Sequence, residues 1–435
     1  MTAITDAEEA HRRVFLVVWG FEEFGGLEHH LAELALALAK RGDDVRVFAE
    51  APLLHGNAYV RRLRAARIST TGAGKLASVA HQLGRVELGR LWGVAVRVLR
   101  VKRQVETRFA RRGGPSALAE EHILAGRGYH PVTTDLFRRL DAAVADGMPD
   151  VVHVHGTRLR QHWAVAWAAA RGIPSVYTEH VTLHEWKGVA DPEAVEVIQS
   201  NVGALACVSA RSRDSLMAAV GTDIAVAVVK HVVAAAGSPT PMSTTGPLRL
   251  LIIARLELIK GVDVLLRAVA MARDAGHTVH LTVAGDGSQR RTLHELARTL
   301  GLVDVKFLGA VPPEAVPGLL NAADVMALSS RGEGLPVALV EAMAHGRASI
   351  ATRSGGIAEV LRDGVTGILV DPDRADQLAE AIARLASDRG AVTRMGEAAR
   401  RAWETDGWTP EAVLAETDAL YRAARLRFDA RAVHA

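Results

Sequence analysis

Short apolar runs alternate along this chain with longer stretches in which apolar residues recur at helical spacing. Residues 14–19 form the first apolar run, the pair Gly25-Gly26 marks a turn, and residues 27–41 have a helical pattern that ends at Gly42. Similar runs follow at 45–48, 151–155, 174–177, 204–208 and 224–229. Strands that alternate with helices are typical of parallel α/β sheets, so we predict such a sheet in the first half of the chain.

The same alternation begins again in the second half. A cluster of Pro, Gly, Ser and Thr at 237–247 is the best candidate for a linker. After it, strand-like runs occur at 248–254, 280–284, 305–308, 325–328, 349–352 and 368–370, and residues 410–430 have the pattern of a final helix. A chain of 435 residues is long enough for two domains. We predict them at 1–240 and 248–408, followed by a helical segment at 409–435.

The composition is that of an ordinary globular enzyme, with 49% hydrophobic and 23% charged residues. Cys207 is the single cysteine, so no intrachain disulfide can form and nothing indicates an oxidising compartment. The first apolar run is too short to span a membrane, and a polar, acidic N-terminus precedes it. No signal peptide is therefore indicated, and we expect a cytoplasmic protein.

One segment has a concentrated net positive charge. Residues 55–112 contain 14 lysines and arginines but only two acidic residues, although the whole chain has a net charge of +3. One interpretation is an amphipathic helix packed on its own domain, with basic side chains that extend into solvent. A second is adsorption to an anionic membrane, which would make the protein peripheral on the inner face of the membrane. Nucleic-acid binding is disfavoured, because no recognition motif or aromatic platform accompanies the charge.

Two carboxylates lie eight positions apart in the second half. Glu333 is in a Gly-Glu-Gly loop, and Glu341 follows Pro336, which suits the first position of a helix. Glu341 then lies about a turn and a half into that helix, whose N-terminal end favours a bound anion. This element resembles the Glu-x7-Glu element of the retaining glycosyltransferases of family 4. The resemblance implies a GT-B fold, in which two Rossmann-like domains with parallel sheets face each other across a cleft. The first domain would be the acceptor side, and the second would bind the nucleotide-sugar. The helical segment at 409–435 would cross back to the first domain.

The resemblance also implies roles for this element. Glu333 would contact hydroxyls of the donor sugar, and Glu341 would bind the ribose of the nucleotide. A carboxylate can accept hydrogen bonds from two neighbouring hydroxyls. Gly334, Leu335 and Pro336 would line the same donor site.

Arg255 and Lys260 follow a predicted strand and are five residues apart. Ligands of open α/β sheets bind beyond the carboxyl ends of strands, and a leaving diphosphate needs cations or amides to neutralise its charge. Loop charges are commonly just solvated, but the nearby carboxylate pair favours a functional interpretation. By resemblance, both residues contact the donor diphosphate, and Val311 lies where the family holds the base, largely by main chain.

The first half supplies the remaining candidates. Gly25 and Gly26 lie between a strand and a helix, where glycine lets the backbone approach a ligand, although a plain tight turn fits them equally well. In the family this loop faces the donor phosphates and the acceptor. His180 ends a predicted strand where the family places a histidine near the reaction centre, so it is the catalytic candidate of this half. The acceptor candidates are Glu28, His29, His30 and His155.

His153 and His155 alternate along one strand and therefore point to one face of its sheet. A metal site would need two further ligands that the sequence does not locate. Packing, or lining of the cleft by His155, is the favoured interpretation, and we predict no metal.

The resemblance implies an enzyme that moves a hexosyl unit from a nucleotide-diphospho-sugar to an acceptor hydroxyl with retention of configuration. Arg255, Lys260, Glu333 and His180 would serve catalysis, and no bound cofactor is expected. A UDP-sugar is the favoured donor, with GDP- and ADP-sugars as alternatives. The alternative functions are a GT-B sugar-nucleotide epimerase or phosphorylase, or a non-catalytic sugar-nucleotide-binding protein.

The chain departs from the family pattern in two places. Residues 230–234 read Lys-His-Val-Val-Ala where the family often has Asn-Gly-Val/Ile-Asp, and residues 54–130 contain no recognisable family feature. Acceptor contacts usually lie in this half, so the acceptor is the least defined part of the expectation. The sequence does not indicate the donor sugar, the linkage position or the oligomeric state.

Overall fold

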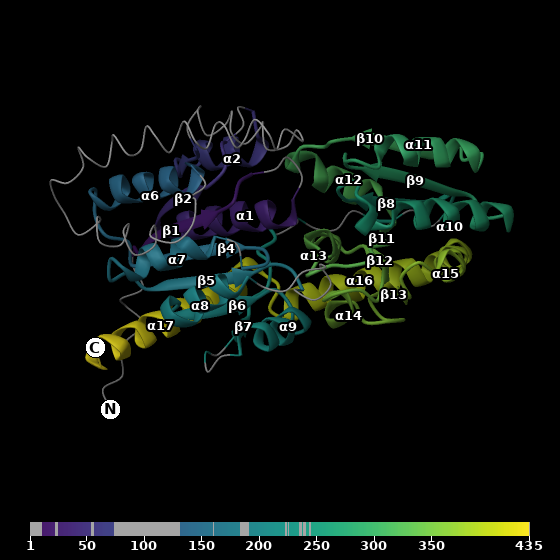
Figure 1. The fold of residues 1–435 in the computed structure, drawn as a ribbon. Helices are drawn as coiled ribbons and strands as arrows, with labels where there is room; N and C mark the ends of the chain where they lie inside the picture. The colour runs from purple at the N-terminus through teal and green to yellow at the C-terminus, as the bar shows by residue number, and fades with distance from the viewer. Residues whose placement is uncertain are drawn as a thin grey trace.

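The computed structural model describes residues 11–21, 25–53, 56–73, 131–159, 161–182, 191–221, 224, 226–234, 237, 241–242 and 245–434. Within these residues the chain forms two parallel sheets that lie side by side and carry helices on their faces (Figure 1). Of the basic segment 55–112, only 56–73 are included. The predicted roles of that segment therefore rest mainly on residues outside the described ones.

The first sheet has the strand order β3-β2-β1-β4-β5-β6-β7, and all of its pairs are parallel. The strands are β1 (Arg13–Val18), β2 (Asp44–Ala49), β3 (Ser69–Thr71), β4 (Val151–Gly156), β5 (Ser175–Glu179), β6 (Ala204–Cys207) and β7 (Val226–Val228). The helices are α1 (Gly26–Arg41), α2 (Ala58–Ala65), α6 (Pro131–Val144), α7 (His162–Ala169), α8 (Pro192–Asn201) and α9 (Ala210–Val220).

Both faces of this sheet are covered, which explains why its strands read as continuous apolar runs. Successive side chains of β1 point to opposite faces. Leu16 packs with residues of α1, α2 and the C-terminal helix, whereas Phe15 packs with residues of α6, α7, α8 and α9.

The second sheet has the order β10-β9-β8-β11-β12-β13 and is also parallel throughout. The strands are β8 (Leu248–Ile253), β9 (Val279–Ala284), β10 (Val305–Gly309), β11 (Val325–Leu328), β12 (Ala348–Thr352) and β13 (Gly367–Val370). The helical elements are η2 (Leu258–Lys260), α10 (Val262–Asp274), α11 (Arg290–Thr299), η3 (Pro313–Ala315), α12 (Val316–Ala322), α13 (Val337–Ala344), α14 (Ile357–Val360), α15 (Ala375–Ser387), α16 (Arg389–Thr405) and α17 (Pro410–His434).

Every apolar run predicted as a strand is a strand, with ends that differ by at most two residues. The apolar pattern does not reveal α2, β3, α6 or α8. The strand β3 has only three polar residues, Ser69, Thr70 and Thr71, at the edge of the sheet. In α2, three arginines interrupt the buried residues. Short, polar elements at an edge bury too little apolar surface to leave a clear period in the sequence.

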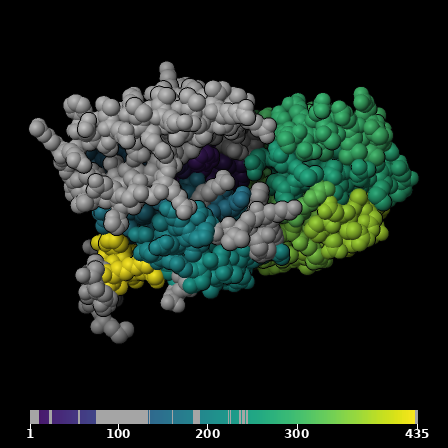
Figure 2. Space-filling model, in the orientation of Figure 1, coloured from purple at the N-terminus to yellow at the C-terminus, as the bar shows by residue number. Residues whose placement is uncertain are grey.

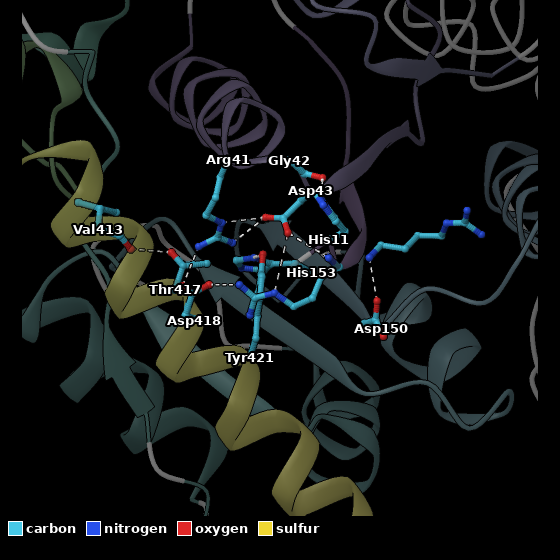
Figure 3. A network of polar contacts seen from close by, with 12 residues as sticks. His11, Arg41, Gly42, Asp43, Asp150, His153, Val413, Thr417, Asp418 and Tyr421 are labelled. Atoms are coloured by element: carbon cyan, nitrogen blue, oxygen red, sulfur yellow. Dashed lines mark hydrogen bonds and ion pairs between the residues drawn. The ribbon is translucent and has the colours of Figure 1, made fainter. Parts of the chain in front are cut away.

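The last helix returns to the first sheet. After α16, which packs on the second sheet, α17 lies against β5, β6 and α1, and it is the yellow helix beneath the teal strands in Figure 1. Asp418 on α17 pairs with Arg12 before β1 and, at 2.7 Å, with Arg41 at the end of α1. Arg41 also contacts Asp43, and the Tyr421 hydroxyl lies 3.0 Å from Nδ1 of His153 (Figure 3). This network of largely buried contacts therefore attaches α17 to the first sheet and to α1.

Among the described helices, none has the length and apolar content needed to cross a membrane.

We expect Asp418→Ala to lower the free energy of unfolding by about 2–3 kcal/mol, because it leaves two largely buried guanidinium groups without this partner. The effect should fall below the roughly 3–5 kcal/mol typical of fully buried pairs, since the Arg12 and Arg41 side chains are 21% and 25% exposed. Urea unfolding monitored by circular dichroism measures it.

Asp429→Ala on the same helix is the matched control. Asp429 is 55% exposed and pairs at i,i+4 with Arg425, so its loss should change stability by less than about 0.5 kcal/mol. Equal effects of the two substitutions would contradict the importance of the network.

Candidate active site

A cavity of about 460 Å³ lies between the two sheets. Its wall is formed at the carboxyl ends of β1, β4 and β5 in the first sheet and of β8, β9 and β11 in the second. In Figure 2 the two halves of the chain appear as a teal lobe and a green lobe that meet beside a hollow. This is the position at which parallel α/β sheets bind ligands.

Fourteen of the candidate residues line this cavity. They are Gly25, Gly26, Glu28, His29, His155, His180, Arg255, Lys260, Val311, Glu333, Gly334, Leu335, Pro336 and Glu341. His30 does not line the cavity and is buried behind its wall, with 3% of its surface exposed. The roles of these residues remain predictions.

Glu333 is held by one group from its own loop and one from the neighbouring element η2. Its Oε1 lies 2.5 Å from Nζ of Lys260 and 2.7 Å from the Ser330 hydroxyl. Both charged side chains are largely buried, with 19% of Lys260 and 9% of Glu333 exposed. An ammonium has three donors, so Lys260 can contact Glu333 and a bound anion together.

A second charge pair fixes the loops that carry this contact. Arg331 follows Ser330 and makes two hydrogen bonds of 2.9 Å to the Asp263 carboxylate at the start of α10. It also contacts Asp373 at 2.7 Å. Lys260 and Glu333 come from segments more than seventy residues apart, and Arg331 holds these segments together. The sequence pattern does not single out Arg331, although it lies two residues before Glu333.

Gly334 explains the Gly-Glu-Gly loop. A Cβ atom at this position would lie 2.2 Å from the carbonyl oxygen of His180 in the first half, which no larger residue can accept. The next carbonyl, of Leu335, accepts a 3.0 Å hydrogen bond from Nε2 of His231. His231 stands where the chain departs from the family pattern, so that segment contacts the loop of Glu333 and Gly334 directly.

Pro336 differs from the expectation in one detail. The sequence predicts it at the first position of the helix, whereas it is the N-cap residue of α13, with an extended backbone at φ −74° and ψ 121°. Proline fixes only φ, and its φ is compatible with both positions. Glu341 is consequently the fifth residue of α13.

Glu341 faces α1 across the cavity. One of its oxygens lies 3.5 Å from Nε2 of His29, and each side chain is 13% exposed. Burial raises the pKa of the Glu341 carboxyl and lowers the pKa of the His29 imidazole. Both shifts favour the neutral forms, so this contact is a weak ion pair.

Two helix N-termini meet at the cavity. Gly26 begins α1, and a Cβ atom placed on it would lie 3.5 Å from the side chain of Val337, which begins α13. The carboxylate of Glu28 covers Gly25 so closely that a side chain at Gly25 would displace it. The amides of the first helical turns and the helix dipoles make this part of the wall favourable for a phosphate group.

A group of histidines backs the first-half wall. Nδ1 of His155 lies 3.1 Å from Nε2 of His180. His153 instead contacts Tyr421 and Thr178, at 3.0 and 2.8 Å. Burial lowers the pKa of all these imidazoles, that of His153 to about 3, so they are neutral at physiological pH.

Nitrogen atoms of His30, His155 and His180 lie within 4.8 Å of one another, so the structure groups His155 as a candidate metal ligand with these two histidines and not with His153, its partner in the sequence pattern. However, His155 and His180 direct nitrogens at each other, and Nδ1 of His30 accepts the amide proton of Val232 at 3.2 Å. In neutral His30 the other nitrogen is then protonated. The lone pairs are thus largely in use, and the expectation of no metal stays a prediction.

Other residues of the cavity wall are not among the candidates from the sequence. Those with aromatic, polar or charged side chains include Trp19, Tyr59, Arg158, Gln161 and His231. Trp19 ends the first apolar run, which is a usable signal, but the others lie in segments without a recognisable motif. Arg255 is exposed at the end of β8, as its position after a strand indicates.

Two family models match this chain. "Glycosyl transferases group 1" matches residues 242–402, and "Glycosyl transferase 4-like domain" matches residues 25–231. Together they span most of the chain; the second covers the first sheet except β1, and the first covers the whole second sheet.

Relatives and solved structures agree with these matches. A glycogen synthase of Mycobacterium tuberculosis is 28% identical over 431 residues, which is 95% of each chain. A GDP-mannose-dependent alpha-(1-6)-phosphatidylinositol monomannoside mannosyltransferase of the same organism is 36% identical over 164 residues, 36% of this chain and 42% of the relative. The crystal structure of Anabaena HepE in complex with UDP and glucose has a TM-score of 0.67 at 19% identity, covering 94% of this chain and all of that one.

The two sheets, the cavity between their carboxyl ends and these matches lead to one assignment. The chain is a glycosyltransferase of group 1 and family 4, with the GT-B fold.

Proposed function

We propose that this glycosyltransferase moves a hexosyl unit from a nucleotide-diphospho-sugar to an acceptor hydroxyl and retains the anomeric configuration. The observation that carries the proposal is the buried contact between Lys260 and Glu333, at 2.5 Å, in the wall of the cavity between the sheets. This contact puts the ammonium group that we propose for the diphosphate beside the carboxylate that we propose for the sugar hydroxyls.

In this proposal Arg255 and Lys260 neutralise the departing diphosphate. The N-termini of α1 and α13 add fixed dipoles that favour the same negative charge. Glu333 orients the sugar through its hydroxyls, and Glu341 binds the ribose. Val311, after β10, lies beside the base.

The acceptor would approach from the first-half wall, which Glu28, His29 and His155 help to form. The carbonyl oxygen of His180 abuts Gly334 in the Glu333 loop, and in this proposal His180 lies beside the reaction centre. In a front-face displacement the leaving phosphate takes the proton of the attacking hydroxyl. The acceptor oxygen bonds to the anomeric carbon as the bond to the phosphate oxygen breaks.

Three nucleotides are candidates for the donor. A uridine donor is favoured, and HepE binds UDP in its crystal structure. The mycobacterial mannosyltransferase is named for GDP-mannose, so guanosine remains in the test set with adenosine.

Lys260→Ala should lower turnover by roughly 10²–10³-fold, the cost of removing one group that stabilises transition-state charge. It should also weaken binding of the preferred nucleotide among UDP, GDP and ADP. Isothermal titration and donor-consumption assays measure the two effects. Lys306→Ala, an exposed lysine of β10, is the control and should match the parent; near-normal turnover of Lys260→Ala would remove the proposed role.

Glu333→Gln should separate sugar binding from nucleotide binding. The amide keeps the size of the side chain but loses the charge, so catalytic efficiency should fall by roughly 10²-fold while affinity for the free nucleoside diphosphate is kept or increased. Titrations with the nucleotide and with its sugar conjugate make the comparison, with exposed Glu295→Gln as control. Loss of nucleotide affinity with unchanged preference for the sugar conjugate would contradict the assignment.

Retention predicts that an α-linked donor gives an α-linked product. Proton NMR of the first product formed, before any anomeric equilibration, reports the configuration through the coupling constant of the anomeric proton. A β-linked product would overturn the retaining mechanism but leave the transferase assignment intact.

A further inference from the structure

An arginine on the first-half wall of the cavity is not among the donor-site candidates. Arg158 follows β4 and lines the cavity together with Thr157 and Gln161. Among the described residues its guanidinium has no carboxylate partner, whereas Lys260 is paired with Glu333 and Arg331 with Asp263. A cation that a cleft leaves unneutralised is available to an anionic ligand.

Hydrogen bonds to a buried carboxylate fix the backbone of Arg158. Arg158 and Leu159 have φ angles of 61° and 55°, in the left-handed region that non-glycine residues rarely adopt. The carboxylate of Glu179, at the end of β5, accepts the amide protons of Arg158 at 3.0 Å and Leu159 at 2.9 Å. Glu179 is completely buried, so Arg158 extends from a fixed base.

Helix α7 begins directly after this loop, and its first turn contains no acidic residue. Its positive end therefore adds to the charge of Arg158 on the same wall. A second observation points to a ligand there. His155 and His180 also line the cavity, and each has a buried ring nitrogen without a hydrogen-bond partner among the described residues: Nε2 of His155 and Nδ1 of His180.

These imidazoles are 0% and 8% exposed, and burial lowers the pKa of both well below the usual value. They are therefore neutral and offer hydrogen bonds rather than charge. The wall thus combines the exposed guanidinium of Arg158 and a helix N-terminus with neutral hydrogen-bonding groups, and the carboxylate of Glu28 lies on the same wall in the first turn of α1. That combination suits a ligand with one anionic group and several hydroxyls.

We propose that the first-half wall binds an acceptor that carries a phosphate ester, a phosphorylated polyol, with the phosphate on Arg158 and hydroxyls on His155 and His180. The planar guanidinium matches phosphate oxygens in a bidentate manner. The proposal rests on the proposed function, because it takes this wall as the acceptor side. A soluble sugar or cyclitol phosphate and a phosphorylated lipid headgroup share this chemistry.

The test compares acceptors that differ only in the phosphate. Full-length protein, saturated with the nucleoside diphosphate that binds best, is titrated calorimetrically with myo-inositol and myo-inositol 1-phosphate, and with glucose and glucose 6-phosphate. The parent should bind each phosphorylated compound roughly 10- to 100-fold more tightly than its neutral counterpart, the range of a charge-assisted hydrogen-bonded pair. Saturation with nucleotide prevents the probes from occupying the diphosphate site.

Variants assign the effect to Arg158. Arg158→Ala should abolish the preference for the phosphorylated compound, and Arg158→Lys should keep part of it, because lysine retains the charge without the bidentate fork. Arg138→Ala is the matched control, since Arg138 lies on α6 of the same half, does not line the cavity and is 73% exposed; it should leave the preference unchanged. Circular dichroism and thermal melting establish that each variant is folded.

Three results would overturn the proposal. They are equal binding of phosphorylated and neutral compounds by the parent, a preference that persists in Arg158→Ala, and a loss in Arg158→Ala of nucleotide affinity by the same factor, which would place Arg158 in the donor site. The proposed function fails separately, if the parent neither binds a nucleotide nor hydrolyses its sugar conjugate. Nucleotide binding without a phosphate preference defeats only the acceptor proposal.

Vesicles distinguish the two sources of phosphate. The parent is sedimented with phosphatidylcholine vesicles that contain or lack phosphatidylinositol. Binding to the phosphatidylinositol vesicles that Arg158→Ala abolishes supports a lipid acceptor, and a preference seen only with the free compounds supports a soluble one. Adsorption through the basic segment 55–112 would persist in Arg158→Ala, so it cannot be mistaken for binding at the cavity.

Discussion

The cavity depends on one close contact between the two halves, where Gly334 meets the carbonyl of His180. No side chain fits there, and the hydrogen bond from His231 to the Leu335 carbonyl holds the same stretch of backbone from the first half. The second half holds the neighbouring side chain, because Lys260 and Ser330 both contact Glu333. The first half thus fixes the backbone beside Glu333, and the second half fixes its carboxylate. Glycine serves here for close approach and not for a turn.

Charged side chains and helix N-termini both contribute to the charge environment of the cavity. Helices α1 and α13 begin at its wall, which also carries basic side chains and the carboxylates of Glu28, Glu333 and Glu341. The histidines nearby are neutral because burial lowers the pKa of each imidazole. Fixed dipoles need little reorganisation when charge develops on a ligand. This arrangement suits a reaction in which a diphosphate gains negative charge as the sugar leaves.

The return of α17 relates the cavity to the ends of the chain. Asp418 binds arginines beside β1 and at the end of α1, and Tyr421 contacts His153 on β4. His153 is two residues from His155, which pairs with His180 at the cavity. The C-terminal helix therefore supports the layer of side chains behind the proposed acceptor wall. It also adds a second connection between the halves, besides residues 229–247.

The sequence alone determined the order of most strands and supplied the candidates for the donor side, because apolar runs and short motifs are local properties of the chain. Arg255, Lys260, Glu333 and Glu341 are recognisable from their motifs. Arg331 is not, because its importance lies in distant carboxylates at Asp263 and Asp373. Nor are the different contacts of His153 and His155, since both lie in the same apolar strand and point to the same face. Only the tertiary structure decided that His155 reaches the cavity, that His153 binds Tyr421 from the far end of the chain, and that Glu179 holds Arg158 in a left-handed turn. These are contacts between residues distant in sequence, and no local pattern encodes such a contact.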